Sequence, residues 1–320
     1  MEGKKLKTID IIVPCYNEGQ NIYMFMRETH KVVSSLEGYS FRYIFIDDGS
    51  DDNTLEKIKT LTQYVPLKYI SFSRNFGKEA AMYAGLKASR GDFAVIIDAD
   101  LQHPPKLIAQ MIRTVEETGC DSCAARRVSR KGEPRLRSIF ARAFYRIMNR
   151  YSDIEIIDGA VDFRLMSRRM VKAIVDMPES QRFSKGIFAW VGFDTRWIEF
   201  ENVKRISGES KWSVWSLTKY AVDGFIDFAA SPLKFVGVFG GVTAVGSIFY
   251  LIIEILKTLI MGKDTPGYAS TICLILFFGG MIMSILSLIG EYIGRMYMET
   301  KGRPIYIEKE TNIDEDEGIF

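Results

Sequence analysis

Acidic side chains gather at two points of the sequence, each directly after an apolar run. Asp47 and Asp48 follow one run, and Asp98 and Asp100 follow another. Asp98 and Asp100, one residue apart after such a run, are well placed to hold Mg²⁺ or Mn²⁺ against phosphate oxygens, because hard cations take oxygen ligands and share them with a substrate. The alternative for this pair is a solvated turn, and Asp47 and Asp48 can be a turn with a helix cap, since Asp and Ser serve both. The chemistry that Asp98 and Asp100 offer is therefore phosphate binding through a cation.

The elements that must position these carboxylates are strands alternating with helices. Three segments have the pattern of buried strands: 9–13, 41–46 and 93–97. Helical patterns lie between and around them: about 19–36, 52–63 and 78–89. This alternation indicates an α/β fold with a mainly parallel sheet. In such sheets ligands bind outside the carboxyl ends of the strands, which is where both acidic clusters fall.

The composition and the absence of two common phosphate-binding motifs argue against several other classes of protein. The 320 residues carry 42 Lys and Arg against 40 Asp and Glu, without the basic excess of a nucleic-acid-binding protein. No G-x-G-x-x-G follows the first strand and no G-x-x-x-x-G-K-[ST] occurs, so dinucleotide and P-loop sites lose their main support. The four Cys are too few and too scattered for a disulfide framework.

Two long apolar segments near the C-terminus predict membrane-spanning helices at about 235–261 and 268–293. No charge interrupts 235–253 or 268–290, and each segment exceeds the roughly 20 residues that cross a bilayer. The alternative is a pair of buried helices in a large soluble core. Only residues 262–267 separate the two segments, so they predict a hairpin with both ends on one side of the membrane. Six Lys and Arg flank the hairpin and one lies in its loop, which predicts that the N-terminal part faces the cytoplasm.

Two amphipathic segments predict helices at the membrane surface. Residues 135–151 alternate apolar side chains with Arg at helical spacing, and residues 212–228 carry aromatic side chains and lead into the first apolar segment. Amphipathic helices of this kind suit the headgroup boundary of a bilayer. The alternative for each is an ordinary helix packed on a soluble core.

Taken in order, four motifs resemble one protein family. They are Val13-Pro14-Cys15-Tyr16-Asn17-Glu18, Asp47-Asp48-Gly49-Ser50-x-Asp52-x-Thr54, Ser73-Arg74-Asn75-Phe76-Gly77-Lys78-Glu79 and Asp98-Ala99-Asp100-Leu101-Gln102-His103-Pro104-Pro105. The series resembles the inverting GT-A-fold glycosyltransferases, in the branch of polyprenyl-phosphate glycosyltransferases that includes dolichol-phosphate mannose synthases and bactoprenol glucosyltransferases. The likeness continues through Asp162-Phe163-Arg164-Leu165, Arg205-x-x-Gly208-x-Ser210-Lys211 and the two apolar segments, and it covers residues 9 to about 300.

This resemblance implies an α/β GT-A nucleotide-sugar-binding domain with a mainly parallel sheet, followed by interfacial helices and a two-helix transmembrane hairpin. The implied parts are a cytoplasmic catalytic domain over 1–211, an interfacial helix over 212–231, the two spans within 232–294 and a cytoplasmic acidic tail over 295–320. The expected location is the plasma membrane, with several passes. The segment 302–320 is either an arm between the subunits of a homo-oligomer or disordered, and the acidic run from Asp314 to Glu317 favours disorder.

The resemblance also implies roles for individual residues. The donor site would take Pro14, Tyr16, Asn17, Glu18, Asp47, Asp48, Lys78 and Asp98. A divalent cation, Mg²⁺ or Mn²⁺, would be held against the donor diphosphate by Asp98, Asp100 and Gln102. Asp162 matches the proposed general base, with pairing to Arg164 or a helix cap as its structural alternative. The phosphate of the acceptor would be received by Arg126, Arg137 and Arg205, and the alternative for each of these is a solvated helix face.

Two positions depart from the family pattern. His103 stands where many relatives have Asp, so we do not count it as a ligand. Ala141 stands where relatives often have Ser near the acceptor phosphate, which weakens that part of the correspondence.

The expected reaction moves a hexose from a nucleotide-sugar of the UDP-glucose or GDP-mannose kind to undecaprenyl or dolichyl phosphate, with inversion to a β-linked product. One alternative is a processive membrane polysaccharide synthase, which should need more spans and a Gln-x-x-Arg-Trp motif that Gln181-Arg182-Phe183 does not supply. The other is a non-catalytic membrane scaffold with a degenerate transferase domain, against which the intact acidic residues argue. The partners expected are thus a nucleotide-sugar, a polyprenyl phosphate and the membrane, and no nucleic acid.

Overall fold

The computed structural model describes residues 6–128, 157–201 and 267–314, together with 243, 246, 249, 250, 252, 253, 256, 259 and 260. Two compact units divide the chain: Met1–Phe225 with Pro304–Phe320, and Ile226–Arg303. The expected interfacial segments 135–151 and 212–228 lie outside the described residues, as does most of the first expected span.

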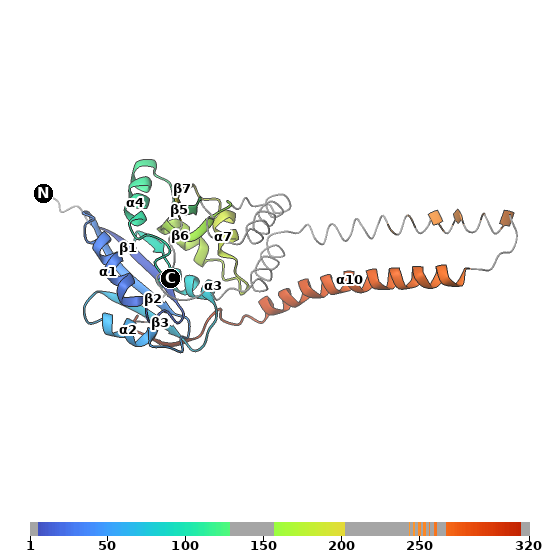
Figure 1. Cartoon of the computed structure of the whole chain (residues 1–320), viewed down its shortest axis with the longest axis horizontal. Helices are drawn as coiled ribbons and strands as arrows, with labels where there is room; N and C mark the ends of the chain where they lie inside the picture. Colours follow the sequence, from blue (N-terminus) through green and yellow to red (C-terminus); the bar gives the residue numbers. More distant parts are fainter. Residues whose placement is uncertain are drawn as a thin grey trace. The chain divides into compact units, whose positions relative to one another are not determined.

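One sheet forms the centre of the first unit (Figure 1). Its strands, in spatial order, are β7 (Thr195–Phe200), β5 (Ser122–Arg127), β6 (Ala160–Ser167), β4 (Phe93–Ile96), β1 (Lys7–Cys15), β2 (Tyr39–Asp47), β3 (Leu67–Phe72) and β8 (Glu308–Thr311). β4, β1, β2 and β3 run parallel, and β7 runs parallel to β5. β6 is antiparallel to both of its neighbours, and β8 is antiparallel to β3. The predicted α/β fold with a mainly parallel sheet is confirmed.

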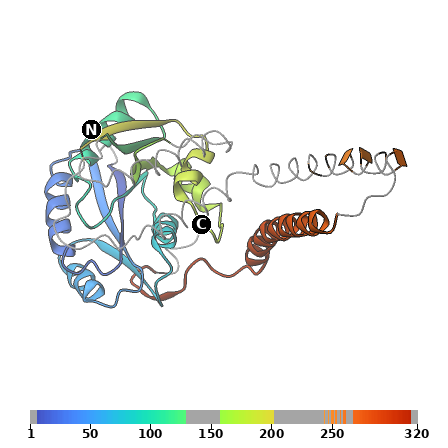
Figure 2. The same cartoon turned by 45° about the vertical axis from the view of Figure 1, so that its right-hand side comes forward.

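Helices cover both faces of this sheet. They are α1 (Ile22–Val33), α2 (Thr54–Leu61), α3 (Lys78–Ala88), α4 (Leu107–Thr118), α6 (Arg168–Val175) and α7 (Ser184–Trp190). The segments predicted as helices coincide with α1, α2 and α3, and those predicted as strands coincide with β1, β2 and β4. Figure 2 shows α1 and α3 on different sides of the parallel strands. A sheet that is buried on both faces explains why its strands are continuous apolar runs.

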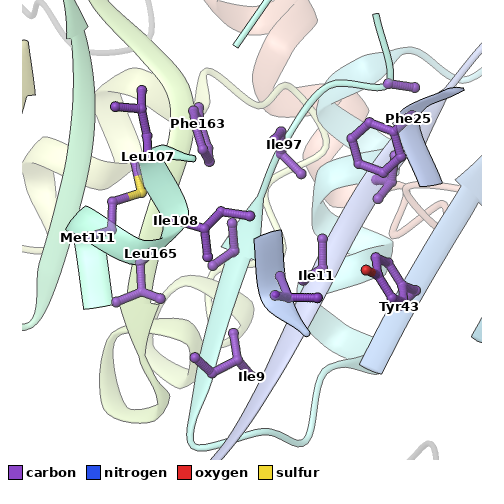
Figure 3. Packing of buried hydrophobic residues seen from close by; sticks show 14 of the residues in the cluster. Ile9, Ile11, Phe25, Tyr43, Ile97, Leu107, Ile108, Met111, Phe163 and Leu165 are labelled. Atoms are coloured by element: carbon purple, nitrogen blue, oxygen red, sulfur yellow. The ribbon is translucent and has the colours of Figure 1, made fainter. Parts of the chain in front are cut away.

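The main core lies between the strands and the helices α1 and α4. Ile9 and Ile11 of β1 pack there with Phe25 of α1 and Met111 of α4 (Figure 3). On the other face, Ile12 meets α3 at Gly85, where an added Cβ would come within 2.2 Å of Ile12 Cγ2. The alternation of side chains along β1 thus fixes one helix layer on each face of the sheet.

In the second unit, α10 (Tyr268–Thr300) is a 33-residue helix. Its part Phe277–Thr300 is long and apolar enough to cross a membrane, by length and composition, and is the one such segment among the residues that the structure describes. Many apolar side chains of α10 are exposed, among them Ile275 at 64% and Met283 at 68%. This helix matches the second expected span but continues beyond residue 293, and the two-helix hairpin stays a prediction.

The expected acidic tail over 295–320 is not a separate segment. Residues 295–300 belong to α10, and Glu308–Thr311 form β8, the edge strand of the sheet in the first unit. Charge density favours disorder only where the chain has no partner, and the open edge of β3 supplies backbone groups that must be paired. Residues 308–311 are therefore an ordered strand, while residues 315–317 of the acidic run that favours disorder lie outside the described part of the chain.

One buried acid, Asp10 of β1, ties the start of the sheet together. Its carboxylate is fully buried and accepts hydrogen bonds from Arg42 Nε at 2.7 Å, Ser89 Oγ at 2.9 Å and the amides of Arg90 and Gly91, both at 2.6 Å. These contacts lie near the amino ends of β1 and β4, away from the acidic clusters.

We expect Asp10→Ala to destabilise the protein by about 3 kcal/mol, because the donor groups of Ser89, Arg90, Gly91 and Arg42 lose a buried charged acceptor, and only Arg42 keeps access to water. The melting temperature of the full-length protein measures this. Asp92→Ala is the matched control, since Asp92 is exposed and its carboxylate accepts from the Thr8 amide at 2.8 Å, while the Arg168 amide binds its backbone carbonyl, which the substitution keeps. Equal melting temperatures for the two variants would contradict the role of Asp10.

Candidate functional site

The loops after β1 and β2 are held together by hydrogen bonds from backbone to side chain. The Asn17 amide donates to Ser50 Oγ, and the Glu18 amide donates to Thr54 Oγ1, both at 2.9 Å. Ser50 and Thr54 therefore support the loop rather than face a ligand. The half-buried side chains of this loop, with Pro14 buried at the end of β1, are Tyr16, Asn17 and Glu18.

The two acids that end β2 have different partners. Asp47 is buried and accepts from Ser71 Oγ at 2.8 Å and from the Ser50 amide at 3.2 Å. Asp48 accepts from the amides of Phe76 at 2.6 Å and Gly77 at 3.0 Å. Burial raises the pKa of Asp48 to about 6, although these two amides counteract the rise. Asp47 thus braces the sheet, while Asp48 fixes the loop that leads into α3.

Gly49 allows the close approach of that loop. Its φ is +65°, and a Cβ at this position would lie 2.4 Å from the carbonyl carbon of Arg74. Only glycine combines a left-handed backbone with so short a distance to another main chain. The Asp-Asp-Gly-Ser motif therefore brings the second and third motifs of the sequence into contact.

Lys78, the first residue of α3, joins two carboxylates that are 64 positions apart in the sequence. Its ammonium lies 2.7 Å from Asp98 Oδ1 and 2.9 Å from Asp162 Oδ2. The register explains the meeting, because β4 and β6 are antiparallel with Ile96 opposite Arg164. Continuing that ladder by two residues sets Asp98 opposite Asp162.

The charges of this cluster keep Asp162 ionised. Burial alone would raise the pKa of Asp162, but Lys78 and then Lys185 hold it well below its ordinary value. Burial would likewise lower the pKa of Lys78, but the carboxylates of Asp162 and Asp98 raise it above the ordinary value. Within this cluster, Lys78 and Asp162 are thus both charged at neutral pH. Its three members are partly exposed, so a substrate can reach them.

Asp162 lies within β6, so it caps no helix, and its ion pair is with Lys78. Neighbouring Arg164 also contributes positive charge at Asp162. The Arg164 guanidinium itself lies 3.8 Å from the ring centroid of Phe188. A cation–π contact of this kind satisfies part of the electrostatic need of a buried guanidinium.

Two further residues lie at the site. Lys185, in the first turn of α7, contributes positive charge at Asp162, and no motif in the sequence marks it. His103, which follows Asp98 and Asp100 in the same motif, is buried between the rings of Phe163 and Phe200, and its Nδ1 lies 3.7 Å from Asp98 Oδ2. Burial lowers the pKa of His103, so the imidazole is neutral beside Asp98. Tertiary packing, and not sequence spacing, gives Lys185 its place beside Asp162.

The residues expected to hold a cation follow β4 in one tight turn. Asp100 is buried and its Oδ1 accepts from the Gln102 amide at 3.1 Å, while Leu101 between them has a φ of +58°. The described residues contain no group of three or more His, Cys, Asp or Glu side chains placed to hold a metal ion. Two carboxylates and a carboxamide are hard oxygen donors, and Mg²⁺ commonly takes one or two carboxylates together with substrate phosphates. The donor set of Asp98, Asp100 and Gln102 fits such a shared cation.

The expected acceptor-phosphate residues are placed only in part. Arg126 lies on β5, donates from Nε to the Asp158 carbonyl at 3.0 Å and lies 3.8 Å from Glu199. Arg137 and Arg205 fall outside the described residues, as does Ala141.

Comparison with known proteins connects this site with a family. The sequence pattern of Glycosyl transferase family 2 matches residues 10–175, a range that contains the acidic cluster and Lys78. The chain is 44% identical over 306 residues to CsbB of Bacillus subtilis, a protein named as a glycosyltransferase, covering 95% of this chain and 92% of the relative. It is 40% identical over 302 residues to the prophage bactoprenol glucosyl transferase homolog of Escherichia coli, covering 94% of this chain and 98% of the relative. It is 38% identical over 302 residues to the bactoprenol glucosyl transferase of Shigella phage SfX, with the same coverage. A chain with this α/β fold, matched over more than half its length by one family pattern and over nearly all of it by these relatives, belongs to glycosyl transferase family 2 and is a glycosyltransferase.

Proposed function

We propose that this glycosyltransferase moves a hexose from a nucleotide-sugar to a polyprenyl phosphate, with inversion, and gives a β-linked polyprenyl-phosphate sugar. The observation that carries the proposal is the Lys78 ammonium between Asp98 and Asp162, because it joins the metal and donor side of the site to the residue expected on the acceptor side. The relatives named bactoprenol glucosyl transferases support the lipid acceptor and make glucose the first sugar to test.

On the donor side, the nucleoside binds at the loop of Tyr16, Asn17 and Glu18, beside the loop that Asp48 fixes. The diphosphate lies toward Asp98, Asp100 and Gln102, which would hold Mg²⁺ or Mn²⁺. When bound, the cation neutralises charge on the leaving diphosphate. Lys78 adds a positive charge at the same place and keeps the Asp98 carboxylate in position.

On the acceptor side, the phosphate is already an anion, so the enzyme has little need to remove a proton. A carboxylate whose pKa is held well below the ordinary value is a weak base. Asp162 therefore serves mainly to orient the reacting groups. Lys185 offers positive charge there, and Arg126, Arg137 and Arg205 remain the proposed phosphate contacts. An acceptor oxygen bonds to the anomeric carbon as the bond to the diphosphate breaks on the opposite face. A single displacement of this kind inverts the configuration.

A direct test incubates the purified full-length protein with undecaprenyl phosphate and a panel of UDP-glucose, UDP-galactose, UDP-N-acetylglucosamine and GDP-mannose. Mass spectrometry of the lipid fraction identifies the transferred sugar, and NMR of the product gives its anomeric configuration. We expect one donor to yield a β-linked lipid phosphate sugar. Release of the nucleoside diphosphate without a lipid product, or formation of an α-linked product, would contradict the proposal.

Membrane orientation gives a second test. We propose that two spans form a hairpin and that the catalytic domain faces the cytoplasm, in line with α10 and with the Lys and Arg asymmetry around the apolar segments. In intact cells, Asp264→Cys is expected to react with an impermeant maleimide, and Ser50→Cys is expected to react only after lysis. The reverse pattern would place the site away from cytoplasmic nucleotide-sugars.

The pKa of Asp48 predicts a pH limit for donor binding. Protonation of Asp48, with a pKa of about 6, weakens its bonds to the Phe76 and Gly77 amides and loosens the donor loop. The affinity for UDP-glucose should therefore fall about tenfold for each pH unit below that pKa, as for any binding that needs one ionised group. Calorimetry without acceptor avoids titration of the lipid phosphate. Asp48→Asn should bind UDP-glucose more weakly, and its affinity should not fall further below pH 6. If the affinity of this variant falls with pH as in the wild type, a group other than Asp48 causes the fall.

A further inference from the structure

The segment Pro304–Ile313 lies along the outer edge of the sheet and is bound over the length of β3. Three register pairs join the strands: Ile70 with Thr311, Ser71 with Glu310, and Phe72 with Glu308. Asn312 closes one end, accepting from the Tyr69 amide at 2.7 Å and donating to the Leu67 carbonyl at 3.0 Å. At the other end, the Ser73 amide donates to the Ile307 carbonyl at 2.9 Å. This pairing therefore continues to the first residue of the loop that leads to α3.

Aromatic contacts extend from this segment into that loop. The ring of Tyr306 stacks on that of Phe72, with centroids 4.7 Å apart and an interplanar angle of 20°. Phe72 is buried and meets Phe76 edge to face, with centroids 5.8 Å apart. Tyr306 also meets Tyr83 of α3 at 6.5 Å. Tyr306 thus touches both the end of β3 and the helix that begins with Lys78.

The contacts continue to the charged cluster. The amides of Phe76 and Gly77 bind Asp48, and the next residue, Lys78, bridges Asp98 and Asp162. A displacement of Phe72 would change the path of residues 73–77, because Phe76 packs against its ring and the Ser73 amide is tied to residue 307. Packed aromatic rings resist such a displacement, since a small gap already loses much of their contact energy.

We propose that Tyr306 is a positioning residue for the donor site: through Phe72 and Phe76 it holds the loop 73–77 in the conformation in which that loop binds Asp48 and presents Lys78. The C-terminal segment is then part of the frame of the active site and more than a cover for an open sheet edge. The nature of the ligand at this loop rests on the proposed function, whereas the effect of Tyr306 on the loop does not.

The test compares Tyr306→Ala, Tyr306→Phe and Val115→Ala in the full-length protein in nanodiscs. Tyr306→Ala removes the stacked ring, and Tyr306→Phe keeps it. Val115→Ala is the stability control, because Val115 is a buried core residue in the last turn of α4, far along that helix from the acidic turn before it. The readouts are hydrogen exchange of residues 73–78, the KM for UDP-glucose, the KM for undecaprenyl phosphate, and the melting temperature.

We expect Tyr306→Ala to speed amide exchange at Phe76 and Gly77 by about three- to tenfold and to raise the KM for UDP-glucose to a similar extent, the size of an aromatic pair's contribution. The KM for undecaprenyl phosphate should stay within about twofold of the wild-type value. Tyr306→Phe should restore the wild-type exchange rate of the loop and the wild-type KM for UDP-glucose. Val115→Ala should lower the melting temperature without changing loop exchange or donor KM.

A lower melting temperature in Tyr306→Ala with unchanged loop exchange and donor KM would overturn the proposal and leave Tyr306 as a cover for the sheet edge. Failure of Tyr306→Phe to restore loop exchange would also overturn it, because the stacked ring would then not be the cause. If the wild-type protein turns over no donor, the proposed function fails, while hydrogen exchange still decides the role of Tyr306.

Discussion

Asp162→Asn is expected to lower the rate of sugar transfer by about 10²-fold or more, because Asp162 orients the reacting groups and a misplacement of about 1 Å can cost about 10²-fold in rate. Asn keeps the volume of the side chain but loses the charge that pairs with Lys78 at 2.9 Å and faces Lys185. Donor binding rests on Tyr16, Asp48 and the cation site and should stay nearly unchanged. The measurements are turnover, UDP-glucose affinity and melting temperature on the same variant.

The control for this prediction is Asp194→Asn, the same substitution in a surface ion pair, where Asp194 lies 3.5 Å from Arg196 and both are more than half exposed. It should leave turnover unchanged, because exposed pairs contribute little. Since Lys78 and Lys185 hold the pKa of Asp162 low, the loss in Asp162→Asn should be the same across neutral and mildly alkaline pH. Near-normal turnover together with a lower melting temperature would make Asp162 a structural residue.

Removal of divalent cations is expected to lower transfer by at least about 10³-fold, because a cation at the leaving diphosphate stabilises the transition state by several kcal/mol. Addition of Mg²⁺ or Mn²⁺ in excess of the chelator should restore the rate. The prediction follows from the oxygen donors of Asp98, Asp100 and Gln102 in the turn after β4. Steady-state turnover in EDTA, followed by titration with each cation, measures the effect.

Chelator saturated with Mg²⁺ beforehand is the matched control and should not inhibit. Asp100→Asn keeps the turn but removes one carboxylate, and it should raise the cation concentration needed for half-maximal rate. Unchanged turnover in excess EDTA would remove the metal from the mechanism. In that case the Lys78 ammonium, already at Asp98, would be the positive charge available to the diphosphate.

The position of the site was predictable because of a general property of parallel sheets. Apolar runs give the strands β1, β2 and β4, and their carboxyl ends meet at one edge, so acids that follow them in sequence come together in space. The same reasoning does not distinguish Asp47 from Asp48. Asp47 supports the sheet through Ser71, while Asp48 binds the amides of Phe76 and Gly77. Only the conformation of the folded loop separates these two roles.

The C-terminal segment shows a limit of reasoning from charge. Its acidic residues favour disorder in isolation, yet Glu310 lies 2.6 Å from Lys59 and its strand pairs with β3. The unpaired backbone groups of a strand edge stabilise such a partner whatever its sequence, and no local pattern in residues 304–313 reports that an edge is available.

The sequence by itself determined the α/β class, the acidic edge of the sheet and the apolar segments, because alternating apolar runs and strand ends are local features that a linear pattern records. Only the tertiary structure decided that Asp162 lies beside Asp98, that Lys78 joins them and that Tyr306 stacks on Phe72. These contacts depend on the antiparallel insertion of β6 and on the strand that follows α10, and both are set by strand pairing between residues far apart in the chain. Such pairing depends on which edges and registers the whole fold leaves open, and the spacing of residues does not carry that information.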